Sequence, residues 1–327
     1  MMAKSTVRGP YVGVDLGGTN IVAGLVDAEG RVLSRSKKKT GTDTAPDALV
    51  KRIVMTVQEI LAEARIGAGD LAAIGVGAPG PVDPGRGMVL KAPNLGWSAV
   101  PLADLLSAQL KVPAFVDNDV NVGTWAEHVL GAGQGVQDMM GVFVGTGIGA
   151  GLVLDGRLYH GHFRTAGEIG HTWIHADAPR GRRTLENVAS RTAIGFQLHQ
   201  LALASNQTVL TRFADEGDLR SIRSKALAKA LEAGDELTRT VVQQAATYVG
   251  VAIANQVTVL SLPCVVLGGG LPEALGRTFV EWVRKAFAAA VFPPELSKCR
   301  IVAAKLGDDA GMVGAALIAR DRLAAGI

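Results

Sequence analysis

The stretch VGVDLGGTN (residues 12–20) has the pattern of a short strand that ends in a glycine-rich bend. A second apolar run at residues 21–26 follows the bend, so the segment predicts a β-hairpin. The stretch GVFVGTGIG (residues 141–149) has the same plan and leads into the apolar run at residues 151–154. We interpret the two segments as an internal duplication, which predicts two related lobes.

The two glycine-rich bends indicate anion binding. Glycine lets consecutive backbone amides converge on an anion without interference from a Cβ atom, and phosphate is the obvious anion. Neither bend is a P-loop, which needs a lysine before serine or threonine, and neither leads directly into a helix as a dinucleotide fingerprint does. The alternative is that both are tight structural hairpins.

A third segment, FVDNDVN (residues 115–121), places three polar residues after an apolar run and before a helix-like segment. A strand that ends in this way can deliver the carboxylate of Asp119 into a cleft, where a general base needs rigid support and partial shielding from water. The alternative is that Asn118 or Asp119 only caps the helix that runs toward Leu130, since both residue types are good caps.

Composition limits the classes of function. The chain has 327 residues, of which 48% are hydrophobic and 19% charged, which is enough to bury the cores of two lobes. The net charge of +3 is spread along the chain, with dense basic runs only at residues 34–39 and 180–183, so nucleic acid is not expected as a partner. No apolar run is long enough to span a membrane, and the first residues lack an apolar signal core. The two cysteines, Cys264 and Cys299, predict reduced thiols and a cytoplasmic protein.

The regions between the hairpins contain further elements. Residues 46–65 have helical spacing, residues 71–76 form a strand-like run, and residues 77–83 form a rigid turn. Asn94 and Trp97 are candidates for sugar contact, with loop anchoring as the alternative.

The second half of the chain adds three polar residues near one loop, Glu168, His171 and Glu186, and one continuous helix from Leu185 past Arg191 toward Leu203. A long helix is expected at residues 235–260. The strand at residues 264–267 ends in a third glycine run (268–270), where a nucleobase could lie against bare backbone; a close strand-to-helix turn is the alternative.

These motifs together resemble the ROK family of repressors and sugar kinases, and the resemblance covers residues 12 to about 323. The motifs occur in the order typical of the family: DLGGTN (15–20), GAPGPVD (77–83), NLGW (94–97), DNDVN (117–121), GTGIG (145–149), AGEIGH (166–171), GGG (268–270) and DDAGMVGAA (308–316).

The resemblance implies an α/β protein with the two-lobed actin-like and hexokinase-like ATPase fold, built from duplicated ribonuclease H-like domains. The N-terminal lobe is expected at residues 1–120, with a C-terminal helix at about 308–327 packing back on it. The larger C-terminal lobe is expected at residues 121–307.

The resemblance also implies residue roles. Asp119 would be the general base, with the sugar held by Asn118, Glu168, His171, Glu186, Gly77 and Asn94. ATP would be bound by Asp15, Gly17, Gly18, Thr19, Asn20, Gly145, Thr146, Gly147, Gly149, Gly269 and Gly270. Asp15 would also help to position Mg²⁺ through water.

One departure from the family concerns zinc. Many members bind a structural Zn²⁺ with the motif C-x-C-G-x-x-G-C-x-E, but counting back from Glu186 the cysteine positions hold Asp177, Pro179 and Thr184. We therefore expect no structural zinc, since a site made of His171, His175 and Asp177 would lack thiolates. Arg180, Arg182 and Arg183 could instead hold the loop by pairing with carboxylates or attract a polyphosphate donor.

The expected function is ATP-dependent phosphorylation of a hexose, with glucose favoured because His171 and Glu186 are present. Other sugars (N-acetylmannosamine, N-acetylglucosamine or fructose) and polyphosphate as the donor stay open. The non-enzyme alternative is a sugar-sensing regulator; the family's repressors carry a DNA-binding segment before the first hairpin, where only some eleven residues precede Val12. The family suggests a homodimer or homotetramer.

Overall fold

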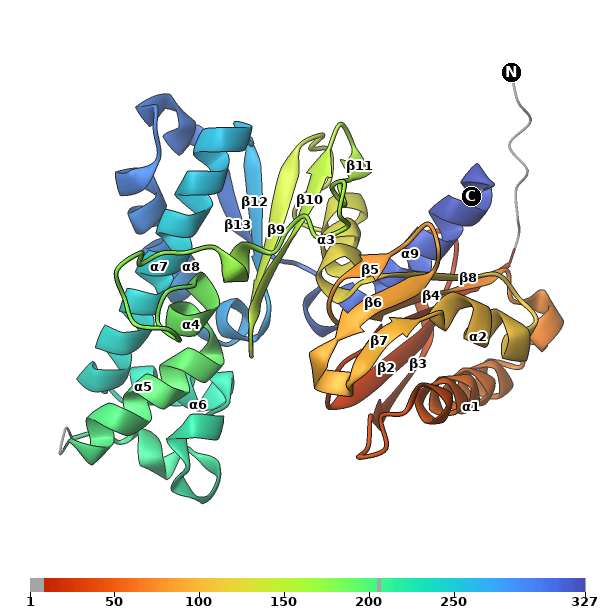
Figure 1. The fold of residues 1–327 in the computed structure, drawn as a ribbon, viewed down its shortest axis with the longest axis horizontal. Helices are drawn as coiled ribbons and strands as arrows, with labels where there is room; N and C mark the ends of the chain where they lie inside the picture. Colours follow the sequence, from red (N-terminus) through yellow and green to blue (C-terminus); the bar gives the residue numbers. More distant parts are fainter. Residues whose placement is uncertain (1–8, 205–206, 327) are drawn as a thin grey trace. The chain divides into compact units, whose positions relative to one another are not determined.

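The computed structural model describes residues 9–204 and 207–326 and divides into two compact units. Unit 1 comprises residues 1–134, 158–166 and 308–327, and unit 2 comprises residues 135–157 and 167–307. Each unit is built on one five-stranded sheet, and helices pack on it (Figure 1).

The sheet of unit 1 has the strand order β3-β2-β1-β4-β8. Strands β1, β2 and β3 form an antiparallel meander, and β4 and β8 continue the sheet in parallel. The strands are β1 (Tyr11–Leu16), β2 (Asn20–Val26), β3 (Val32–Lys39), β4 (Ala73–Ala78) and β8 (Ala114–Asn118).

Helices cover both faces of this sheet. The even-numbered side chains of β1 pack with α1 (Pro46–Ala64) and α2 (Leu102–Leu110) in one core. The other face carries α9 (Ala310–Ala325) and α3 (Asp119–Val129), which lie side by side (Figure 1).

Glycines allow α9 to approach the sheet closely. A Cβ atom on Gly13 would lie 1.8 Å from the Met312 carbonyl oxygen, and one on Gly75 would lie 1.8 Å from the Ala315 oxygen. On the helix itself, a Cβ on Gly314 would lie 1.8 Å from the Val122 oxygen of α3. Larger side chains at these positions would force the helices and the sheet apart.

The sheet of unit 2 repeats the plan of unit 1 with the order β11-β10-β9-β12-β13. Strands β9 (Met139–Val144) and β10 (Ile148–Leu154) form the second glycine hairpin, and β12 (Cys264–Gly268) and β13 (Arg300–Ala303) run parallel to β9. The short edge strand is β11 (Arg157–Leu158). This shared strand order confirms the predicted duplication and the α/β fold class.

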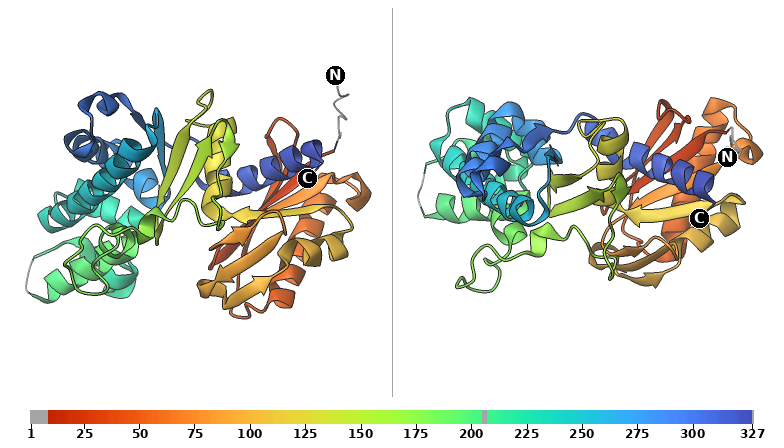
Figure 2. Two further views of the ribbon diagram at one scale, coloured as in Figure 1. Left: turned by 45° about the horizontal axis from the view of Figure 1, so that its top comes forward. Right: turned by 90° about the horizontal axis from the view of Figure 1, so that it is seen from above.

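Unit 2 is rich in helices, which can be followed in both views of Figure 2. The long helices α7 (Glu236–Leu260) and α8 (Gly270–Ala290) pack against each other, α8 also packs on the sheet, and both contribute to the main core. The others are α4 (Leu185–Ala189), α5 (Arg191–Leu203) and α6 (Ser224–Glu232).

Several elements differ from the sequence expectation. The single helix expected from Leu185 to Leu203 is broken at Ser190, whose extended backbone ends α4 and whose hydroxyl caps α5 by accepting the Ala193 amide. A small three-stranded sheet, β5 (Val82–Asp83), β6 (Met88–Ala92) and β7 (Trp97–Val100), occupies a region expected to be turns and loops. Trp97 is buried there and donates its ring N–H to the Thr44 oxygen at 2.6 Å, so it anchors the loop.

The contact-based units also divide the chain differently from the expected lobes. The expected boundary at residue 120 lies at the start of α3, but α3 packs on α9 and β4 and therefore belongs to unit 1. Residues 158–166 join unit 1 as well, although unit 2 residues flank them in the sequence.

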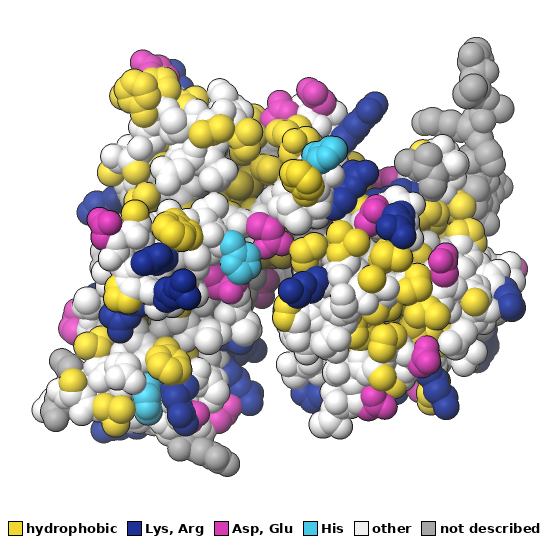
Figure 3. Space-filling model, in the orientation of Figure 1, with side chains coloured by type: hydrophobic (Ala, Val, Ile, Leu, Met, Phe, Trp, Pro, Cys, Tyr) yellow, Lys and Arg dark blue, Asp and Glu magenta, His cyan; other side chains and the backbone are white. Residues whose placement is uncertain are grey.

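The surface has mixed character. On the face drawn in Figure 3, basic and acidic side chains are interspersed among polar and hydrophobic ones. Among the helices in the described residues, none is long and apolar enough to cross a membrane.

Candidate functional site

The predicted site residues fall into two groups, one in each unit, and each group surrounds a glycine hairpin. The first group, in unit 1, contains Asp15, residues 17–20, Gly77, Asn94, Asn118 and Asp119. The second, in unit 2, contains Gly145, Thr146, Gly147, Gly149, Glu168, His171, Glu186, Gly269 and Gly270.

The carboxylate of Asp119 stands at the start of α3, where β8 ends. Two groups donate hydrogen bonds to its Oδ1 atom: the amide of Val120 at 2.9 Å and the side-chain Nδ2 of Asn118 at 3.0 Å. Asn118 is the residue that caps α3, since its Oδ1 accepts the amides of Val120 and Asn121. Asn118 Nδ2 also donates to the Gly80 oxygen at 3.0 Å, which ties this corner to the turn after β4.

Gly77 explains how the helix can begin so close to the sheet. A Cβ atom at this position would lie 2.6 Å from Val122 and 3.4 Å from the Asp119 Cα atom. The absence of a side chain at Gly77 therefore lets the first turn of α3, with Asp119, pack directly on β4. Asn94 lies beside the hairpin, with its side chain about 4 Å from where a Gly18 Cβ would be.

The hairpin of unit 1 is tightly clamped. The Gly17 amide donates to the Asn20 oxygen across the bend at 2.9 Å. From the end of β3, the buried Thr40 donates its hydroxyl to the Gly17 oxygen at 2.6 Å and its amide to the Thr19 oxygen at 2.9 Å. The acceptors in these three hydrogen bonds are the carbonyl oxygens of Gly17, Thr19 and Asn20. No local sequence pattern marks Thr40, because its partners lie more than twenty residues away.

Asp15 is the titratable group with the most perturbed environment in this hairpin. Burial and the nearby Asp308 carboxylate raise its pKa to about 6, against a smaller opposing effect of Lys37. Two carboxylates close together, one of them desolvated, form a place where a divalent cation would relieve both the burial cost and the repulsion. The residues present therefore fit Mg²⁺ near Asp15, although no cluster of three metal-ligating side chains is found among residues 9–204 and 207–326.

The hairpin of unit 2 is held by α4 and α5. Glu186 Oε2 accepts the Ile148 amide at 2.9 Å, and a Cβ atom on Gly147 would lie 2.4 Å from the same oxygen. Arg191 donates its backbone amide to the Gly145 oxygen at 2.8 Å and its Nη2 to the Thr146 hydroxyl at 2.6 Å. The break at Ser190 is what lets one side chain from each helix reach the loop.

Glu168 and His171 lie on a short turn beside the same hairpin. Gly167 has a φ of 97°, and a Cβ there would lie 2.0 Å from the Ala150 oxygen of β10. The carboxylate and the imidazole are 3.8 Å apart and largely exposed (41% and 69%). A Cβ on the neighbouring Gly170 would lie 3.4 Å from Glu186 Cβ, so Glu168, His171 and Glu186 occupy one region of unit 2.

Gly269 and Gly270 belong to the same surroundings. Gly269 has a φ of 87°, and its Cβ position is 2.8 Å from the backbone nitrogen of Val144, the residue before Gly145. The third glycine run thus lies against the start of the second hairpin, and α8 begins at Gly270. Gly149 faces Phe143 in the β9–β10 register.

The loop from Thr172 to Thr184 is held by contacts within the protein. Residues Trp173 and Thr184 form a β-bridge, and the Ile174 amide donates to the Arg183 oxygen at 2.7 Å. Arg183 lies over the Trp173 ring at 5.0 Å and donates to the Ala178 oxygen. These contacts differ from the carboxylate pairing expected for the arginines. His175 packs edge-on against Tyr248, with ring centroids 5.0 Å apart.

A buried polar network around Asp117, two residues before Asp119, was not predicted from the sequence. Asp117 is 1% exposed, and its carboxylate accepts His160 Nε2 at 2.8 Å, Arg322 Nη2 at 3.1 Å and Asn121 Nδ2 at 3.1 Å. The Asn118 amide donates to the same carboxylate at 2.8 Å. The network therefore fixes the segment 158–166 and the last helix to the residue that precedes the Asn118–Asp119 pair.

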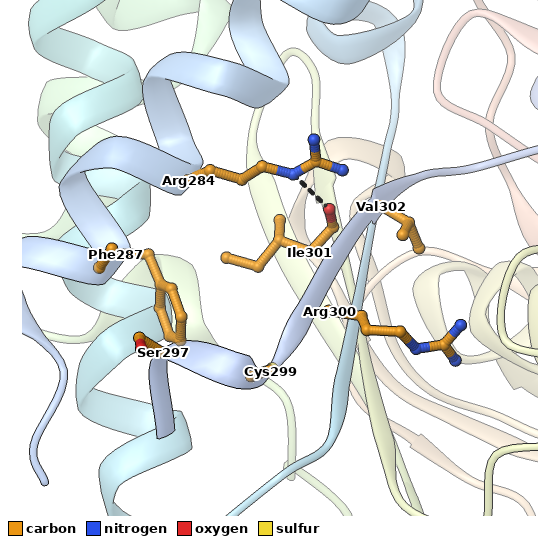
Figure 4. A pocket seen from close by; sticks show the side chains of 8 residues that line it. Arg284, Phe287, Ser297, Cys299, Arg300, Ile301 and Val302 are labelled. Atoms are coloured by element: carbon orange, nitrogen blue, oxygen red, sulfur yellow. Dashed lines mark hydrogen bonds between the residues drawn. The ribbon is translucent and has the colours of Figure 1, made fainter. Parts of the chain in front are cut away.

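A separate hollow of about 320 Å³ lies in unit 2 and contains none of the predicted site residues. Figure 4 shows Arg284 reaching over it to donate to the Ile301 oxygen at 2.7 Å. Cys299 lines this hollow; burial, with a smaller effect of Cys264, raises the pKa of its thiol to about 12. Both cysteines are free thiols.

Comparison with known proteins identifies the family of the chain. The family model described as ROK family matches residues 11–322. A glucokinase of Halalkalibacterium halodurans is 32% identical over 93% of this chain and 93% of its own. The crystal structure of a ROK family glucokinase from Streptomyces griseus, in complex with glucose and AMPPNP, is 34% identical with a TM-score of 0.84 and covers 96% of this chain and 100% of that chain. A ROK family transcriptional regulator is 25% identical with a TM-score of 0.85, and the match covers 98% of this chain and 79% of the regulator.

Proposed function

The chain belongs to the ROK family, and from that premise we propose that it is a sugar kinase that transfers the γ-phosphoryl group of ATP to glucose. The observation that carries the proposal is the similarity to glucokinases over nearly the whole chain, with the Asn118–Asp119 pair at the end of β8. The fold is the two-lobed actin-like and hexokinase-like fold of the ROK glucokinases.

In the proposed reaction, Asp119 accepts the proton of the attacking sugar hydroxyl. The hydroxyl oxygen forms a bond to the γ-phosphorus, the bond from that phosphorus to the β–γ bridging oxygen breaks, and ADP leaves with the electron pair. The hydrogen bonds from Val120 and Asn118 to Asp119 Oδ1 orient the carboxylate for this role. The expected product is glucose 6-phosphate.

The other roles are divided between the units. Asn118, Gly77 and Asn94 in unit 1 and Glu168, His171 and Glu186 in unit 2 are proposed to bind the sugar. Both glycine hairpins are proposed to bind the phosphates, and Gly269 and Gly270 the adenosine. Asp15 would hold Mg²⁺ through water, and the metal would neutralise charge on the phosphates when bound.

The test of the base is Asp119→Asn. We expect kcat to fall by about 10²–10⁴-fold, as for the loss of a positioned general base, with glucose binding retained in calorimetry. The matched control is Asp104→Asn, which removes an exposed carboxylate of α2 in the same unit. Turnover of Asp119→Asn close to that of the control would exclude Asp119 as the base.

The test of the substrate is a panel of hexoses offered with ATP or polyphosphate. We expect glucose with ATP to give the highest kcat/KM. A higher value for N-acetylmannosamine, N-acetylglucosamine or fructose would reassign the sugar, and a higher value with polyphosphate would reassign the donor. Sugar binding without phosphorylation of any hexose would instead support a regulator.

Three further expectations remain proposals. We propose a homodimer or homotetramer, which light scattering of the purified protein would test. We propose a cytoplasmic location, which fractionation of cells would test. We also propose that no structural zinc is present; stoichiometric zinc in protein purified without added metal would contradict it.

A further inference from the structure

Three consecutive lysines near the end of β3 differ in what surrounds them. The sequence Lys37-Lys38-Lys39 lies in an edge strand, where successive side chains point to opposite faces of the sheet. Lys38 lies on the face covered by α1 and pairs with Glu59 at 2.7 Å. Lys37 and Lys39 therefore lie on the opposite face, and both are exposed.

The strand register places this opposite face beside the predicted phosphate hairpin. Asp15 of β1 is opposite Val22 of β2, and Val22 is opposite Lys37 of β3. Directly opposed residues of antiparallel strands share a face, so Asp15 and Lys37 lie on the same side of the sheet in one row. Lys39 is opposite Asn20, the last residue of the DLGGTN segment, and lies one row nearer the bend.

Helix α9 covers the row of Gly13, Gly24 and Arg35 and also packs on Val22, but Lys37 and Lys39 on the edge strand stay exposed. In this row, Met312 occupies the space where side chains at Gly13 and Gly24 would lie. Arg35, at the end of the row, pairs with Asp309 at 3.1 Å. A Cβ atom on Gly311, at the start of the helix, would already lie 2.9 Å from the Asp15 carboxylate. In the row of Lys37, Asp15 and Val22 contact the start of the helix, whereas Lys37 itself is exposed on the edge strand, as is Lys39 in the next row.

The charges in this region are only partly balanced within the chain, since the effect of Lys37 on the pKa of Asp15 is smaller than the opposing effects of burial and Asp308. In the part of the chain that the structure describes, no ion pair joins Lys37 or Lys39 to a carboxylate, whereas Arg35 and Lys38 each have one. The DLGGTN bend contains no cation of its own, although the proposed ligand carries a highly charged triphosphate. Lysine binds phosphate as a flexible point charge and can reach it from a neighbouring strand.

We propose that Lys37 and Lys39 are phosphate-binding residues that contact the triphosphate of ATP at the hairpin of unit 1. This inference rests on the proposed kinase function and adds two residues from outside the family motifs. Lys38 is excluded from the role, because it faces α1.

The test compares Lys37→Ala and Lys39→Ala with Lys38→Ala as the matched control. All three remove the same side chain from one exposed strand, so the global fold should survive in each, which circular dichroism would check. We expect KM for ATP to rise about tenfold for Lys37→Ala and for Lys39→Ala, and by less than about twofold for Lys38→Ala, since a hydrogen bond to a charged group contributes roughly one factor of ten. KM for glucose should change in none of them.

Two further measurements isolate phosphate recognition. Calorimetry should show weaker binding of ATP to the Lys37 and Lys39 variants and unchanged binding of adenosine, which has no phosphate. The salt dependence of ATP binding should also be shallower in these two variants, because each removes one exposed charge contact. Lys37→Arg should restore most of the ATP affinity.

The outcomes separate this inference from the proposed function. If the wild type phosphorylates glucose and the Lys37 and Lys39 variants behave like Lys38→Ala, only the lysine inference is wrong. If the wild type phosphorylates no hexose, the proposed function is wrong, and ATP calorimetry still decides whether the two lysines bind phosphate.

Discussion

The two glycine hairpins have the same backbone plan and different side-chain chemistry. In each, a glycine pair faces across the strands, Gly13 with Gly24 in unit 1 and Gly141 with Gly151 in unit 2. Two residues further toward the bend, unit 1 has Asp15 and unit 2 has Phe143. The duplicated fold therefore preserves the route of the chain, while the carboxylate proposed to hold Mg²⁺ is present in one copy and replaced by an aromatic ring in the other.

The braces of the two hairpins differ as well. In unit 1 the bend is clamped by Thr40 from the adjacent strand, through carbonyl oxygens. In unit 2 Glu186 and Arg191 arrive from helices and engage the Ile148 amide and the Thr146 hydroxyl. The first hairpin is thus held by its own sheet, and the second by an inserted helical region.

The test with the largest expected effect removes the carboxylate from the hairpin of unit 1. Asp15→Asn should lower kcat/KM by about 10²–10³-fold, because it removes the carboxylate proposed to hold Mg²⁺ near the phosphates. Phe143→Leu at the matching position of unit 2 should change it by less than about threefold. Steady-state kinetics at saturating Mg²⁺ would measure both, and equal losses would show that the two hairpins do not differ in this way.

The second test concerns stability. Burial and Asp308 raise the pKa of Asp15 to about 6 in the folded protein, so the folded state binds this proton more tightly than the unfolded chain, where the value is 3.8. The free energy of unfolding therefore falls as pH rises from about 4 to about 6, and the cost is complete above that range. Asp15→Asn cannot ionise and should be more stable than the wild type by about 3 kcal/mol at pH 7.5 without ligands.

Urea denaturation at pH 7.5 and pH 4.5 would measure this difference, which should shrink at the lower pH. Phe143→Leu provides the control from the other hairpin, since it should be destabilised equally at both values. A variant Asp15→Asn that is less stable than the wild type at pH 7.5 would contradict the assignment of a strained, desolvated carboxylate.

The smallest expected effect comes from the brace of unit 2. Arg191→Met removes the 2.6 Å bond to the Thr146 hydroxyl but keeps the backbone bond to Gly145. KM for ATP should rise about three- to tenfold, as expected for one charged hydrogen bond at a partly exposed position. Arg277→Met, which changes an exposed arginine of α8 paired only with Glu281, is the control. A KM for ATP equal to that of the control would show that Arg191 does not help to position the hairpin of unit 2 for ATP.

The sequence predicted those elements of the fold that are specified by residues close together in the chain. Both hairpins were predicted because apolar runs and glycine bends specify them within a few residues. The strand β3 was not, because its exposed Ser34–Lys39 segment looks like a solvated basic run, and only pairing with β2 makes it a strand. The helix break at Ser190 was missed for a related reason: serine both tolerates a helix and caps one, and the contact with the Gly145 loop decides between them.

The candidate site divides in the same way. The motifs supplied the residues of the hairpins and the Asn118–Asp119 pair, and the structure adds that Asn118 is the cap. Thr40, Arg191 and the Asp117–His160–Arg322 network lie outside the motifs, since their partners are distant in sequence. Such residues become visible only when the chain is folded.

The packing of α9 on β1 also sets the order in which unit 1 can be completed during translation. In this contact Gly13, near the start of the sequence, lies against Met312, about 300 residues later. At roughly 5–20 residues per second, a ribosome needs on the order of 15–60 s to make the chain between them. Throughout that interval one face of the first sheet lacks its covering helix, so unit 1 can be completed only after the ribosome has made α9.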